Sequence, residues 1–517
     1  QLLDDWFYMY LAFTQAKDQL WISYPLSDNE GKAKMPSQVI KRMEDLFPEC
    51  REHLLLQDPD ELADAERFIT TPIKTRSALT AQLSRHEKGY PIQSIWWHVL
   101  NWYIENRPKN SITYRTLQSL YYENRPENLK KETVEAMFPK EIKASVSRLE
   151  SYYRCAYQHF AKYSLQLDER KTYKLDAPDI GMLFHEAIKI ITEWIQKEDR
   201  DFAKLNEKEA NTYAERAVSR LAPIFENQIL HSSHRYQYIR MKLQEIIARA
   251  TYILSEQARH SHFSPVGLEL GFGIGETLPP LTMELPNGYR LLLRGRIDRV
   301  DKATNVDQLY LRIIDYKSSS RGLDLLEVYY GLALQMLAYL DVVITNSEKW
   351  LNQKAIPAGV LYFHVHNPML SKNVKPDMET IEKEIFKKYK MDGLLLSDRE
   401  VVQMMDDSIE KNSDIIPAGF KKDGSFAAVS KVTNKETFDH LKSHIHQLME
   451  RAGLDITTGG VHLNPFQYKD KKACTYCPFL SVCQFDPILE ENNYHKLKEM
   501  KEKEIVEKIS EEVEVDG

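Results

Sequence analysis

Several features that would assign this sequence to a common class of protein are scarce or missing. No run of about eighteen apolar residues occurs, so we expect no membrane-spanning helix. Positive charge is not in excess, because the formal net charge of the 517 residues is −7. Proteins that coat nucleic acid rely on concentrated Lys and Arg, so this charge argues against that class. It remains compatible with an enzyme that has a local basic groove.

The start of the chain lacks an initiator Met and the basic and apolar segments of a signal peptide. We therefore expect the sequence to be a piece of a longer protein. No Gly-x-x-x-x-Gly-Lys-Ser/Thr loop, the usual phosphate-binding signature of nucleotide hydrolysis, occurs. Cysteine is also scarce: five residues, without a signal segment, indicate a reducing cytoplasm rather than a disulfide framework.

The distribution of apolar residues divides the chain into regions. Residues 27–145 are rich in Leu, Glu, Lys and Arg at helical spacing, which predicts a helical region. Residues 146–490 alternate helical and strand patterns, and they predict a mixed α/β domain with a central, mainly antiparallel sheet flanked by helices. The strands are expected at 266–274, 281–284, 289–300, 309–316 and 359–364. Residues 491–517 form an acidic tail, which we expect to be solvated.

Three predicted helices of the α/β domain carry residues of chemical interest. An aromatic-rich helix over 143–165 contains Cys155, and a helix that begins near Gly181 contains His185. A third helix, over 325–342, presents Gln335 and Tyr339 on one face, because these residues are four positions apart.

The segment 309–317 has the most informative pattern in the sequence. Alternate side chains of a strand share a face, so one side is lined by Leu309, Leu311, Ile313, Asp315 and Lys317. An apolar face that ends in a carboxylate and an amine suits the open end of a sheet. The carboxylate can hold Mg²⁺, and the amine can orient a water molecule or neutralise charge on a phosphate.

The spacing Asp-x-Lys is by itself a weak signal. It recurs at Asp470 and Lys472 in a polar stretch, and taken alone Asp315 and Lys317 fit a strand-end ion pair better. The neighbouring sequence changes this balance. Asp298 lies on the preceding strand, where a hairpin would bring it beside Asp315, and two adjacent carboxylates are stable only with a cation between them.

Further residues extend this group. His185 could complete the shell of a metal ion, although a single His on an amphipathic helix is more often a core or surface residue. Gln335 and Tyr339 could contact a DNA strand lying across the site, although taken alone they fit the edge of a buried helix. The order along the chain favours the functional interpretation: a helix with His, a strand with Asp, a strand with Asp-x-Lys and a helix with Gln-x-x-x-Tyr.

This order resembles the RecB-like branch of the PD-(D/E)XK nuclease superfamily. The resemblance implies a restriction-endonuclease-like α/β core, in which helices flank a central mixed sheet. It also implies that His185, Asp298 and Asp315 bind Mg²⁺ together with the backbone carbonyl of Tyr316. Lys317 would be the catalytic lysine and would act together with the two aspartates.

The cysteines are grouped rather than spread along the chain. Cys474, Cys477 and Cys483 supply three thiolates from one short turn, and a closed four-cysteine site needs one more. The candidates are Cys50 and Cys155, and Cys155 is favoured because it opens the segment directly before the histidine-bearing helix. Zinc sites usually offer two local pairs of cysteines, whereas this arrangement offers a trio and a distant partner. It therefore favours an iron–sulfur cluster over zinc.

A ligand set that joins Cys155 to Cys474 closes a loop around the whole predicted metal site. Closing so long a loop removes entropy from the unfolded chain, so the cluster would act as a staple. One early cysteine and a late Cys-x₂-Cys-x₅-Cys around nuclease motifs resemble the iron–sulfur nucleases of the AddB and Cas4 type. The resemblance implies a [4Fe–4S] cluster held by Cys155, Cys474, Cys477 and Cys483.

The first residues carry a further resemblance. The segment 10–19, Tyr-Leu-Ala-Phe-Thr-Gln-Ala-Lys-Asp-Gln, is similar to the last motif of superfamily 1 helicases, in which an Arg contacts the nucleotide. Gln15 stands in the place of that Arg and cannot supply its charge. Residues 1–26 are therefore expected to end a degenerate helicase domain that no longer hydrolyses ATP.

A degenerate helicase end, a helicase-derived helical region and an iron–sulfur nuclease, in that order, resemble the AddB subunits of bacterial AddAB helicase–nucleases. The resemblance implies an exonuclease that degrades the 5′-terminated strand when double-strand breaks are resected for recombination. It implies an AddA-like helicase–nuclease subunit as partner, single strands and duplex ends of DNA as substrates, and recognition of Chi by the helicase-like part. Two alternatives are a catalytically inactive DNA-binding scaffold and a stand-alone Cas4-like nuclease. The intact acidic centre argues against the first, and the helicase remnant argues against the second.

Overall fold

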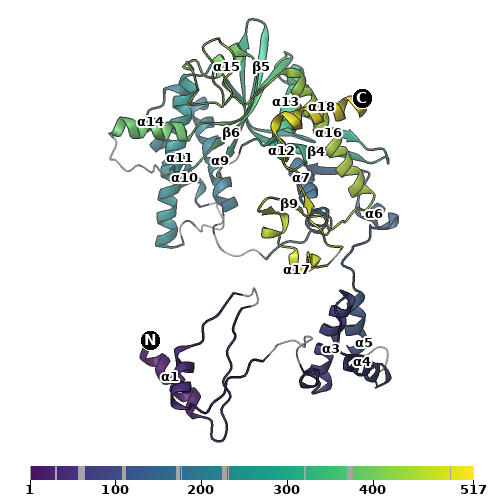
Figure 1. Cartoon of the computed structure of the whole chain (residues 1–517). Helices are drawn as coiled ribbons and strands as arrows, with labels where there is room; N and C mark the ends of the chain where they lie inside the picture. The colour runs from purple at the N-terminus through teal and green to yellow at the C-terminus, as the bar shows by residue number, and fades with distance from the viewer. Residues whose placement is uncertain are drawn as a thin grey trace. The chain divides into compact units, whose positions relative to one another are not determined.

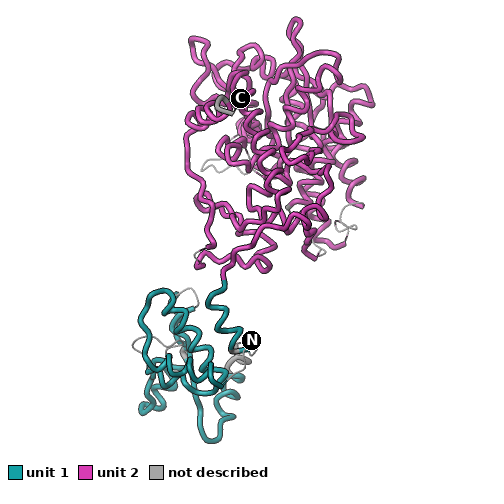
Figure 2. The backbone as a smooth tube through the Cα atoms, turned by 90° about the vertical axis from the view of Figure 1, so that its right-hand side faces the viewer, with its two compact units in different colours: residues 1–122 teal, residues 123–517 magenta. Residues whose placement is uncertain are grey.

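The computed structural model describes residues 2–28, 32–55, 64–106, 112–170, 175, 177–223, 230, 232–319, 322–368, 377–489 and 491–516. The chain forms two compact units, residues 1–122 (unit 1) and residues 123–517 (unit 2), which Figure 2 shows in different colours. Each unit has its own hydrophobic core. No described helix is long and apolar enough to cross a membrane.

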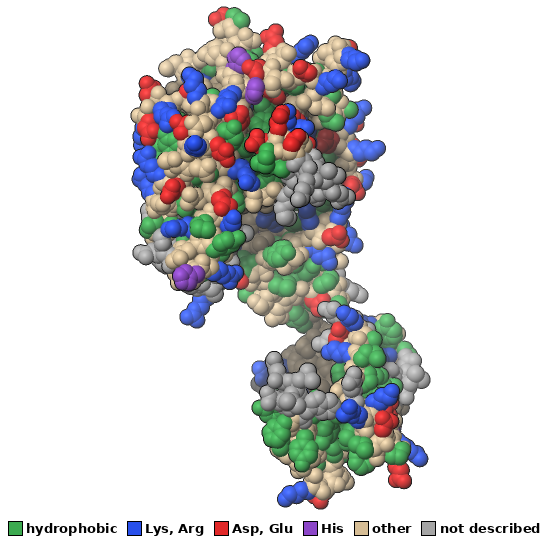
Figure 3. All heavy atoms as spheres, turned by 90° about the vertical axis from the view of Figure 1, so that its left-hand side faces the viewer, with side chains coloured by type: hydrophobic (Ala, Val, Ile, Leu, Met, Phe, Trp, Pro, Cys, Tyr) green, Lys and Arg blue, Asp and Glu red, His purple; other side chains and the backbone are tan. Residues whose placement is uncertain are grey.

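Unit 1 consists of helices joined by extended segments. Its elements are α1 (Leu2–Thr14), α2 (Gln38–Leu46), η1 (Ala65–Phe68), α3 (Pro72–Glu87), α4 (Ile95–Asn106), α5 (Ile112–Gln118) and η2 (Ser119–Tyr121). Leu79, Trp96 and Tyr103 are buried in its core, between α3 and α4. Pro72 begins α3 at a position that suits Pro, and the Thr71 side chain caps that end of the helix. Other large apolar side chains are exposed, and Figure 3 shows hydrophobic side chains gathered on the surface of this unit.

Unit 2 is built around a mixed sheet. Its strands run in the order β1-β4-β5-β6-β7-β8, and β2 and β3 also pair with β4. The pairs β1·β4, β5·β6 and β7·β8 are parallel, and the other pairs are antiparallel. The mixed sheet flanked by helices is therefore confirmed. The strands are β1 (Glu141–Ser145), β2 (Ser264–Phe272), β3 (Leu281–Glu284), β4 (Arg290–Asn305), β5 (Gln308–Lys317), β6 (Ala355–His364), β7 (Asp392–Leu396) and β8 (Val432–Thr433).

Helices cover both faces of this sheet. Figure 1 shows α9, α10 and α11 on one side and α12, α13, α16 and α18 on the other. This covering explains why β5 and β6 are buried along almost their whole length. The helices are α6 (Lys131–Met137), α7 (Val146–Arg154), α8 (Ala156–His159), η3 (Phe160–Ser164), α9 (Ala177–Lys197), η4 (Phe202–Lys204), α10 (Glu207–Leu221), α11 (His234–Arg259), α12 (Leu325–Tyr329), α13 (Gln335–Leu351), α14 (Met378–Lys388), α15 (Arg399–Met405), α16 (Lys435–Thr457) and α18 (Glu502–Asp516).

A second, three-stranded sheet has the order β10-β9-β11. Its strands are β9 (Phe466–Tyr468), β10 (Lys471–Lys472) and β11 (His495–Lys496). Between β10 and β11 the chain forms two short helices, η6 (Ala473–Tyr476) and α17 (Leu480–Cys483). Cys474 lies on η6, Cys477 directly follows it, and Cys483 ends α17. The segment that bears the late cysteines is therefore held at both ends by strands of the small sheet.

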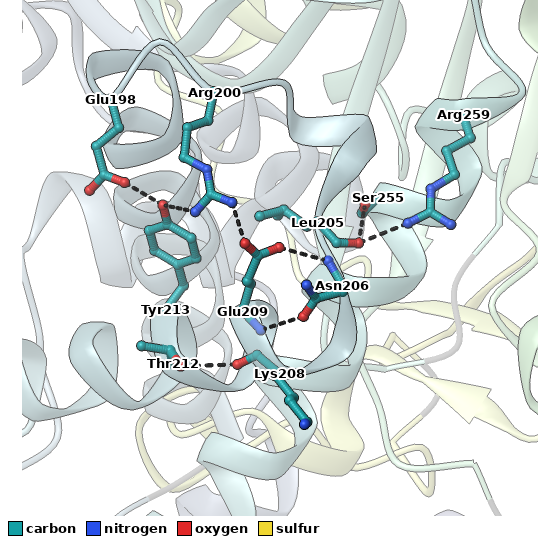
Figure 4. Close-up of polar contacts among 10 residues, drawn as sticks. All are labelled: Glu198, Arg200, Leu205, Asn206, Lys208, Glu209, Thr212, Tyr213, Ser255 and Arg259. Atoms are coloured by element: carbon teal, nitrogen blue, oxygen red, sulfur yellow. Dashed lines mark hydrogen bonds and ion pairs between the residues drawn. The ribbon is translucent and has the colours of Figure 1, made fainter.

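Polar contacts fix the junction between α9 and α10, as Figure 4 shows. Asn206 and Glu209 form a capping box, in which each side chain accepts a hydrogen bond from the backbone amide of the other at 3.0 Å. Arg200 pairs with Glu209, and the Tyr213 hydroxyl donates to Glu198. These contacts hold the end of α9, the helix that carries the predicted histidine.

Two of the predicted helices are interrupted. In place of the helix over 143–165 the structure has β1, α7 and α8, with Cys155 between the helices in an extended conformation (φ −171°, ψ 122°). The helix over 325–342 is divided into α12 and α13 by a turn in which Gly331 has a φ of 76°. A Cβ at Gly331 would lie 2.4 Å from the Tyr153 ring, so both the backbone conformation and the packing require glycine.

The ends of unit 2 also differ from the prediction. The sequence groups residues 123–145 with the helical region, but the structure includes them in unit 2, where β1 pairs with β4. The acidic tail forms α18, and Ile505 and Ile509 of this helix are each 1% exposed. Its apolar face joins the main hydrophobic core, so the prediction of a solvated tail is wrong.

Candidate metal centre and cysteine pocket

The hairpin of β4 and β5 brings two of the predicted carboxylates together. Its ladder pairs Arg299 with Ile314, and one step further along the ladder Asp298 lies opposite Asp315. The Tyr316 amide donates a hydrogen bond to Asp298 Oδ2 at 2.8 Å. Opposite residues of antiparallel strands share a face, so the two carboxylates project to the same side of the sheet.

His185 and Glu269, a residue not predicted from the sequence, form a close group with Asp298. His185 comes from α9, and its Nδ1 lies 3.0 Å from Asp298 Oδ2. Glu269 comes from β2, whose antiparallel ladder with β4 brings it opposite Asp298. One possible ligand atom from each of the three residues lies within 4.8 Å of the other two. In the part of the chain that the structure describes, no other group of three His, Cys, Asp or Glu side chains is as close.

The sequence contains a signal for Glu269 that motif spacing does not reveal. Residues 265–273 read Pro-Val-Gly-Leu-Glu-Leu-Gly-Phe-Gly, so Glu269 is the one charged residue in an apolar strand. Its φ of 47° lies in the left-handed region, which non-glycine residues rarely adopt. A charged residue held in such a conformation within a strand often marks a functional site.

Asp315 and Lys317 lie at the end of β5. Lys317 Nζ lies 2.5 Å from Asp315 Oδ2, an ion pair without hydrogen-bond geometry. That oxygen is buried and has no hydrogen-bond partner among the described residues. Burial and the charge of Asp298 raise the pKa of Asp315 to about 6. The carboxylate is therefore held where its charge is disfavoured unless a further cation is close.

The same crowding acts on the other acidic and basic groups of the site. Burial and the charge of Asp298 raise the pKa of Glu269 to about 7. Burial opposes protonation of His185, but the hydrogen bond to Asp298 and its charge outweigh burial and raise the pKa of His185. Mg²⁺ prefers carboxylate oxygens, and the close group of His185, Glu269 and Asp298 supplies two carboxylates. Asp315 lies outside that close group, and a cation beside it would give its buried Oδ2 a further partner.

Mg²⁺ is expected to raise the melting temperature of unit 2 more at about pH 8 than at about pH 5.5. The pKa values of Asp315 and Glu269 are raised in the folded chain to about 6 and about 7. Between the lower unfolded pKa values and these values, the native state holds protons that the unfolded state has lost. Without metal, stability therefore falls as the pH rises through this window. Mg²⁺ binds the ionised carboxylates, so its stabilisation grows as the pH rises.

Thermal melting of Glu269→Gln, with and without Mg²⁺, tests this expectation. The variant should show a weaker pH dependence without metal and a smaller shift with metal. Glu284→Gln is the matched control, because Glu284 lies on β3 with its side chain 68% exposed, and it should behave like the wild type. A full Mg²⁺ shift in Glu269→Gln would contradict a role of this carboxylate in metal binding.

Gln335 and Tyr339 lie on α13 and contact each other. Gln335 Nε2 donates to the Tyr339 hydroxyl at 2.9 Å, and Tyr339 is 7% exposed. Burial raises the pKa of Tyr339 to about 12, and the charges of Asp298 and Asp315 contribute to this shift. The pair therefore lies near the carboxylates, with most of the tyrosine buried. Its contact with DNA stays a prediction.

The face of the hairpin opposite the carboxylates carries a buried ion cluster. Asp301 is fully buried, at 2.6 Å from Arg299 and 2.9 Å from Arg312, and both arginine side chains are 5% exposed. The Arg312 guanidinium also lies over the Phe263 ring, 4.7 Å from its centroid. Burial opposes ionisation of Asp301, but the arginines hold its pKa below the usual range. The cluster ties together the two strands that carry the catalytic candidates.

The predicted cysteine ligands line one pocket. Cys155, Cys474, Cys477 and Cys483 all contribute to its wall. Burial raises the pKa of Cys155 to about 11. Cys50, the alternative fourth ligand, is exposed in unit 1. The rest of the wall is mainly apolar and includes Tyr157, Leu463, Pro465, Ala473, Phe479, Leu480 and Phe485.

The backbone around Cys155 is arranged to accept negative charge on its sulfur. The backbone amides of Gln158, Asn464 and Tyr157 act to lower the pKa of Cys155, but burial outweighs them and raises it. Asn464 Oδ1 also accepts a hydrogen bond from the Ala156 amide at 2.9 Å, which joins the early cysteine to the segment before the late ones. Four cysteines that line one mainly apolar pocket supply the thiolates that an iron–sulfur cluster needs, so these residue types fit this group.

Comparison with known proteins agrees with this geometry. The model of the PD-(D/E)XK nuclease superfamily matches residues 143–484, which is more than half of the chain. The chain therefore belongs to the PD-(D/E)XK nuclease superfamily. The fifth domain of the AddB ATP-dependent helicase/deoxyribonuclease matches residues 61–119, within unit 1.

The similar full-length proteins are named as the B subunits of ATP-dependent helicase/deoxyribonucleases. The one from Oceanobacillus iheyensis is 63% identical over 100% of this chain. Those from Bacillus licheniformis and Bacillus subtilis are 46% and 45% identical over 100% and 99% of this chain. In each case the chain covers 44% of the relative's length. The resemblance to AddB subunits is thus confirmed, for a chain that spans less than half the length of these relatives.

Proposed function

We propose that the chain is the nuclease part of an AddB-type subunit and hydrolyses phosphodiester bonds of DNA with Mg²⁺. The trio of His185, Glu269 and Asp298 beside the Asp315–Lys317 pair carries this proposal. A non-catalytic scaffold would have no need to bury a carboxylate with a raised pKa beside a lysine, and such groups gather at active sites. The deoxyribonuclease names of the relatives support the same reaction.

The ligands of the ion come from three elements in this proposal. His185 of α9, Asp298 of β4 and Asp315 of β5 hold Mg²⁺, together with the backbone carbonyl of Tyr316. Glu269 of β2 supplies a further carboxylate next to Asp298. Bound Mg²⁺ supplies Lewis acidity and a water molecule of lowered pKa.

The other polar groups act on the substrate. Lys317 Nζ, which contacts Asp315 Oδ2, orients the attacking water and neutralises charge that develops on the phosphate. Gln335 and Tyr339 are the proposed contacts to the DNA strand. Their mutual hydrogen bond holds the Gln335 amide in one orientation.

We further propose that the strand cut here is the 5′-terminated strand. An AddA-like subunit would supply the motor and cut the other strand at duplex ends, in cytoplasmic resection of double-strand breaks. The helicase-like part of the subunit would recognise Chi rather than hydrolyse ATP. Gln15 in the place of the nucleotide-contacting Arg supports this division of labour, because an amide cannot stabilise the phosphate charge.

Degradation of end-labelled DNA tests the proposed reaction. The full subunit, assembled with its motor subunit without oxygen, is compared with its Asp315→Ala variant, each with and without Mg²⁺. We expect the variant to lose cutting of the 5′-terminated strand only, with cutting of the other strand retained by the partner. Equal cutting of that strand by both proteins would exclude Asp315 as a metal ligand and favour a DNA-binding scaffold.

We also propose that the cysteine pocket holds a [4Fe–4S] cluster. The support is the single pocket lined by one early and three late cysteines. Such a cluster would join α7 and α8 to the last part of unit 2 and so enclose the whole metal centre. Zinc is the alternative ion for the same thiolates.

Cys155→Ser is expected to remove most of the iron and sulfide from the protein and to lower its melting temperature. The change opens the loop that the cluster would close and leaves the three late cysteines without a fourth thiolate. Iron, sulfide and zinc analysis of protein purified without oxygen measures the effect, and Cys50→Ser is the exposed control. Wild-type iron content in Cys155→Ser would mean that the ligand set is different.

A further inference from the structure

The end of unit 2 near the cysteine pocket contains a buried asparagine pair. Asn124 is 8% exposed and Asn492 is 1% exposed. They lie on either side of the family match over residues 143–484, yet they contact each other. Asn124 Nδ2 donates to Asn492 Oδ1 at 2.9 Å, and Asn492 Nδ2 donates to the Asn124 carbonyl at 2.9 Å. The pair therefore joins the first residues of unit 2 to a segment near its end.

Asn124 also holds the backbone that carries one of the cysteines. The helix α17 ends at Cys483, and Gln484 turns the chain away with a φ of 51°. Carbonyls at the end of a helix have no partner within the helix. Asn124 Nδ2 lies 3.0 Å from the Cys483 carbonyl and 2.9 Å from the Gln484 carbonyl, so its two N–H groups are shared among these oxygens and Asn492 Oδ1. It thus caps the helix from a distant part of the sequence.

Asn492 holds the same turn from the other side. Its Oδ1 accepts a hydrogen bond from the Asp486 amide at 3.2 Å. Phe485, directly before Asp486, lines the cysteine pocket and packs against Tyr494 with 4.9 Å between ring centroids. The turn from Cys483 to Asp486 is therefore anchored at both of its ends.

We propose that Asn124 and Asn492 are positioning residues for the metal group of the cysteine pocket, acting through Cys483. This inference rests on the proposed role of the cysteines as ligands. Cys483 lies on a helix of four residues, which is too short to be stable by itself. Its thiolate can keep a fixed position only if other parts of the chain hold that helix. The asparagine pair makes these contacts, with both amide groups removed from water.

The consequence is that two segments outside the family match contribute to metal retention. The stretch that follows unit 1 contacts the Cys483–Gln484 backbone through the Asn124 side chain, and the backbone amide of Asn124 donates to Glu491 Oε1 at 2.7 Å. The start of unit 2 and the segment after the last cysteine thus meet at the turn that follows Cys483. Loss of either asparagine should loosen one cysteine ligand without touching any of the four thiols.

Asn124→Ala and Asn492→Ala in the full subunit, purified without oxygen, test this inference. Iron, sulfide and zinc are measured per chain, followed by the rate at which a chelator removes the metal. We expect release about tenfold faster than from the wild type, the order of effect of removing a buried hydrogen-bond partner. Asn124→Asp keeps the size of the side chain but loses both donors, and it should release metal at least as fast.

Ser413→Ala is the matched control for a general loss of stability. Ser413 is 2% exposed, and its hydroxyl joins Asp406 to the amides of Ile415 and Ile416, away from the cysteine pocket. Faster metal release in the asparagine variants but not in Ser413→Ala, with all of them folded, supports the inference. Wild-type release rates in asparagine variants that merely melt earlier would overturn it. Wild-type protein without bound metal would overturn the cysteine site itself, and the inference with it.

Discussion

Replacing Lys317 by alanine is expected to slow DNA cleavage about 100- to 1,000-fold while leaving Mg²⁺ binding nearly intact. Lys317 Nζ lies at the open end of β5, in contact with Asp315. A protonated amine cannot bind a metal ion, so its removal takes away stabilisation of charge in the transition state. The proposed ligands His185, Glu269 and Asp298 are unchanged in this variant. Single-turnover cleavage of a labelled single strand, over a range of Mg²⁺ concentrations, measures the effect.

Two comparisons separate this loss from weaker metal binding. Asp315→Asn removes a proposed ligand, so added Mg²⁺ should restore part of its activity, whereas no Mg²⁺ concentration should restore Lys317→Ala. Lys431→Ala is a control beside the same sheet, because Lys431, directly before β8, also pairs with an aspartate, Asp392 of β7, at 2.7 Å. It should cut like the wild type. A Lys317→Ala protein with the wild-type rate would show that another group stabilises the charge that develops on the phosphate.

The part of the site that follows from the sequence is the part whose geometry is local. Alternation along a strand puts Asp315 and Lys317 on one face, and the short turn between Asn305 and Gln308 sets the hairpin register that places Asp298 opposite Asp315. The cysteine trio is local in the same way. Its joining to Cys155 in one pocket could be anticipated because few cysteines were available.

Residues whose role depends on tertiary contacts are harder to find from the sequence. Glu269 reaches the site only because β2 pairs with β4. The sequence of β2 alone does not show which strand it pairs with. Asn124 and Asn492 are in contact, although almost the whole sequence of unit 2 lies between them. The apolar strand around Glu269 marks this residue as unusual, but only the fold shows that it lies beside Asp298.

Breaks in helices are a second kind of feature that the sequence conceals. The helical spacing around Cys155 continues on both sides of it, yet the extended backbone at this residue ends one helix and begins another. At Gly331 the chain turns with a φ of 76°, and the Tyr153 ring leaves no room for a Cβ there. Periodicity reports which face of a segment is buried, but a single residue with a different φ and ψ changes the direction of the chain without altering that pattern.

Asp301→Ala is expected to destabilise unit 2 by about 3–5 kcal/mol. The change removes the carboxylate shared by Arg299 and Arg312, whose side chains are each 5% exposed. Two buried positive charges would then lack their common partner, which is far more costly than losing an ion pair in water. Urea-induced unfolding of unit 2 measures the change. Glu141→Ala is the control, because Glu141 pairs with Arg290 at 3.0 Å with side chains 56% and 45% exposed, and it should cost less than about 1 kcal/mol.

A triple replacement, Arg299→Met with Asp301→Leu and Arg312→Met, separates the cost of unpaired charge from the role of the cluster in the site. Apolar side chains of similar volume should recover much of the stability lost in Asp301→Ala, because no buried charge is left without a partner. Arg299 directly follows Asp298, so the cluster is in a position to fix that carboxylate. If stability and cleavage both recover, the cluster serves the fold alone. If stability recovers and cleavage does not, the buried charges also hold Asp298 in place for the metal. A stability of Asp301→Ala within about 1 kcal/mol of the wild type would contradict the ion cluster itself.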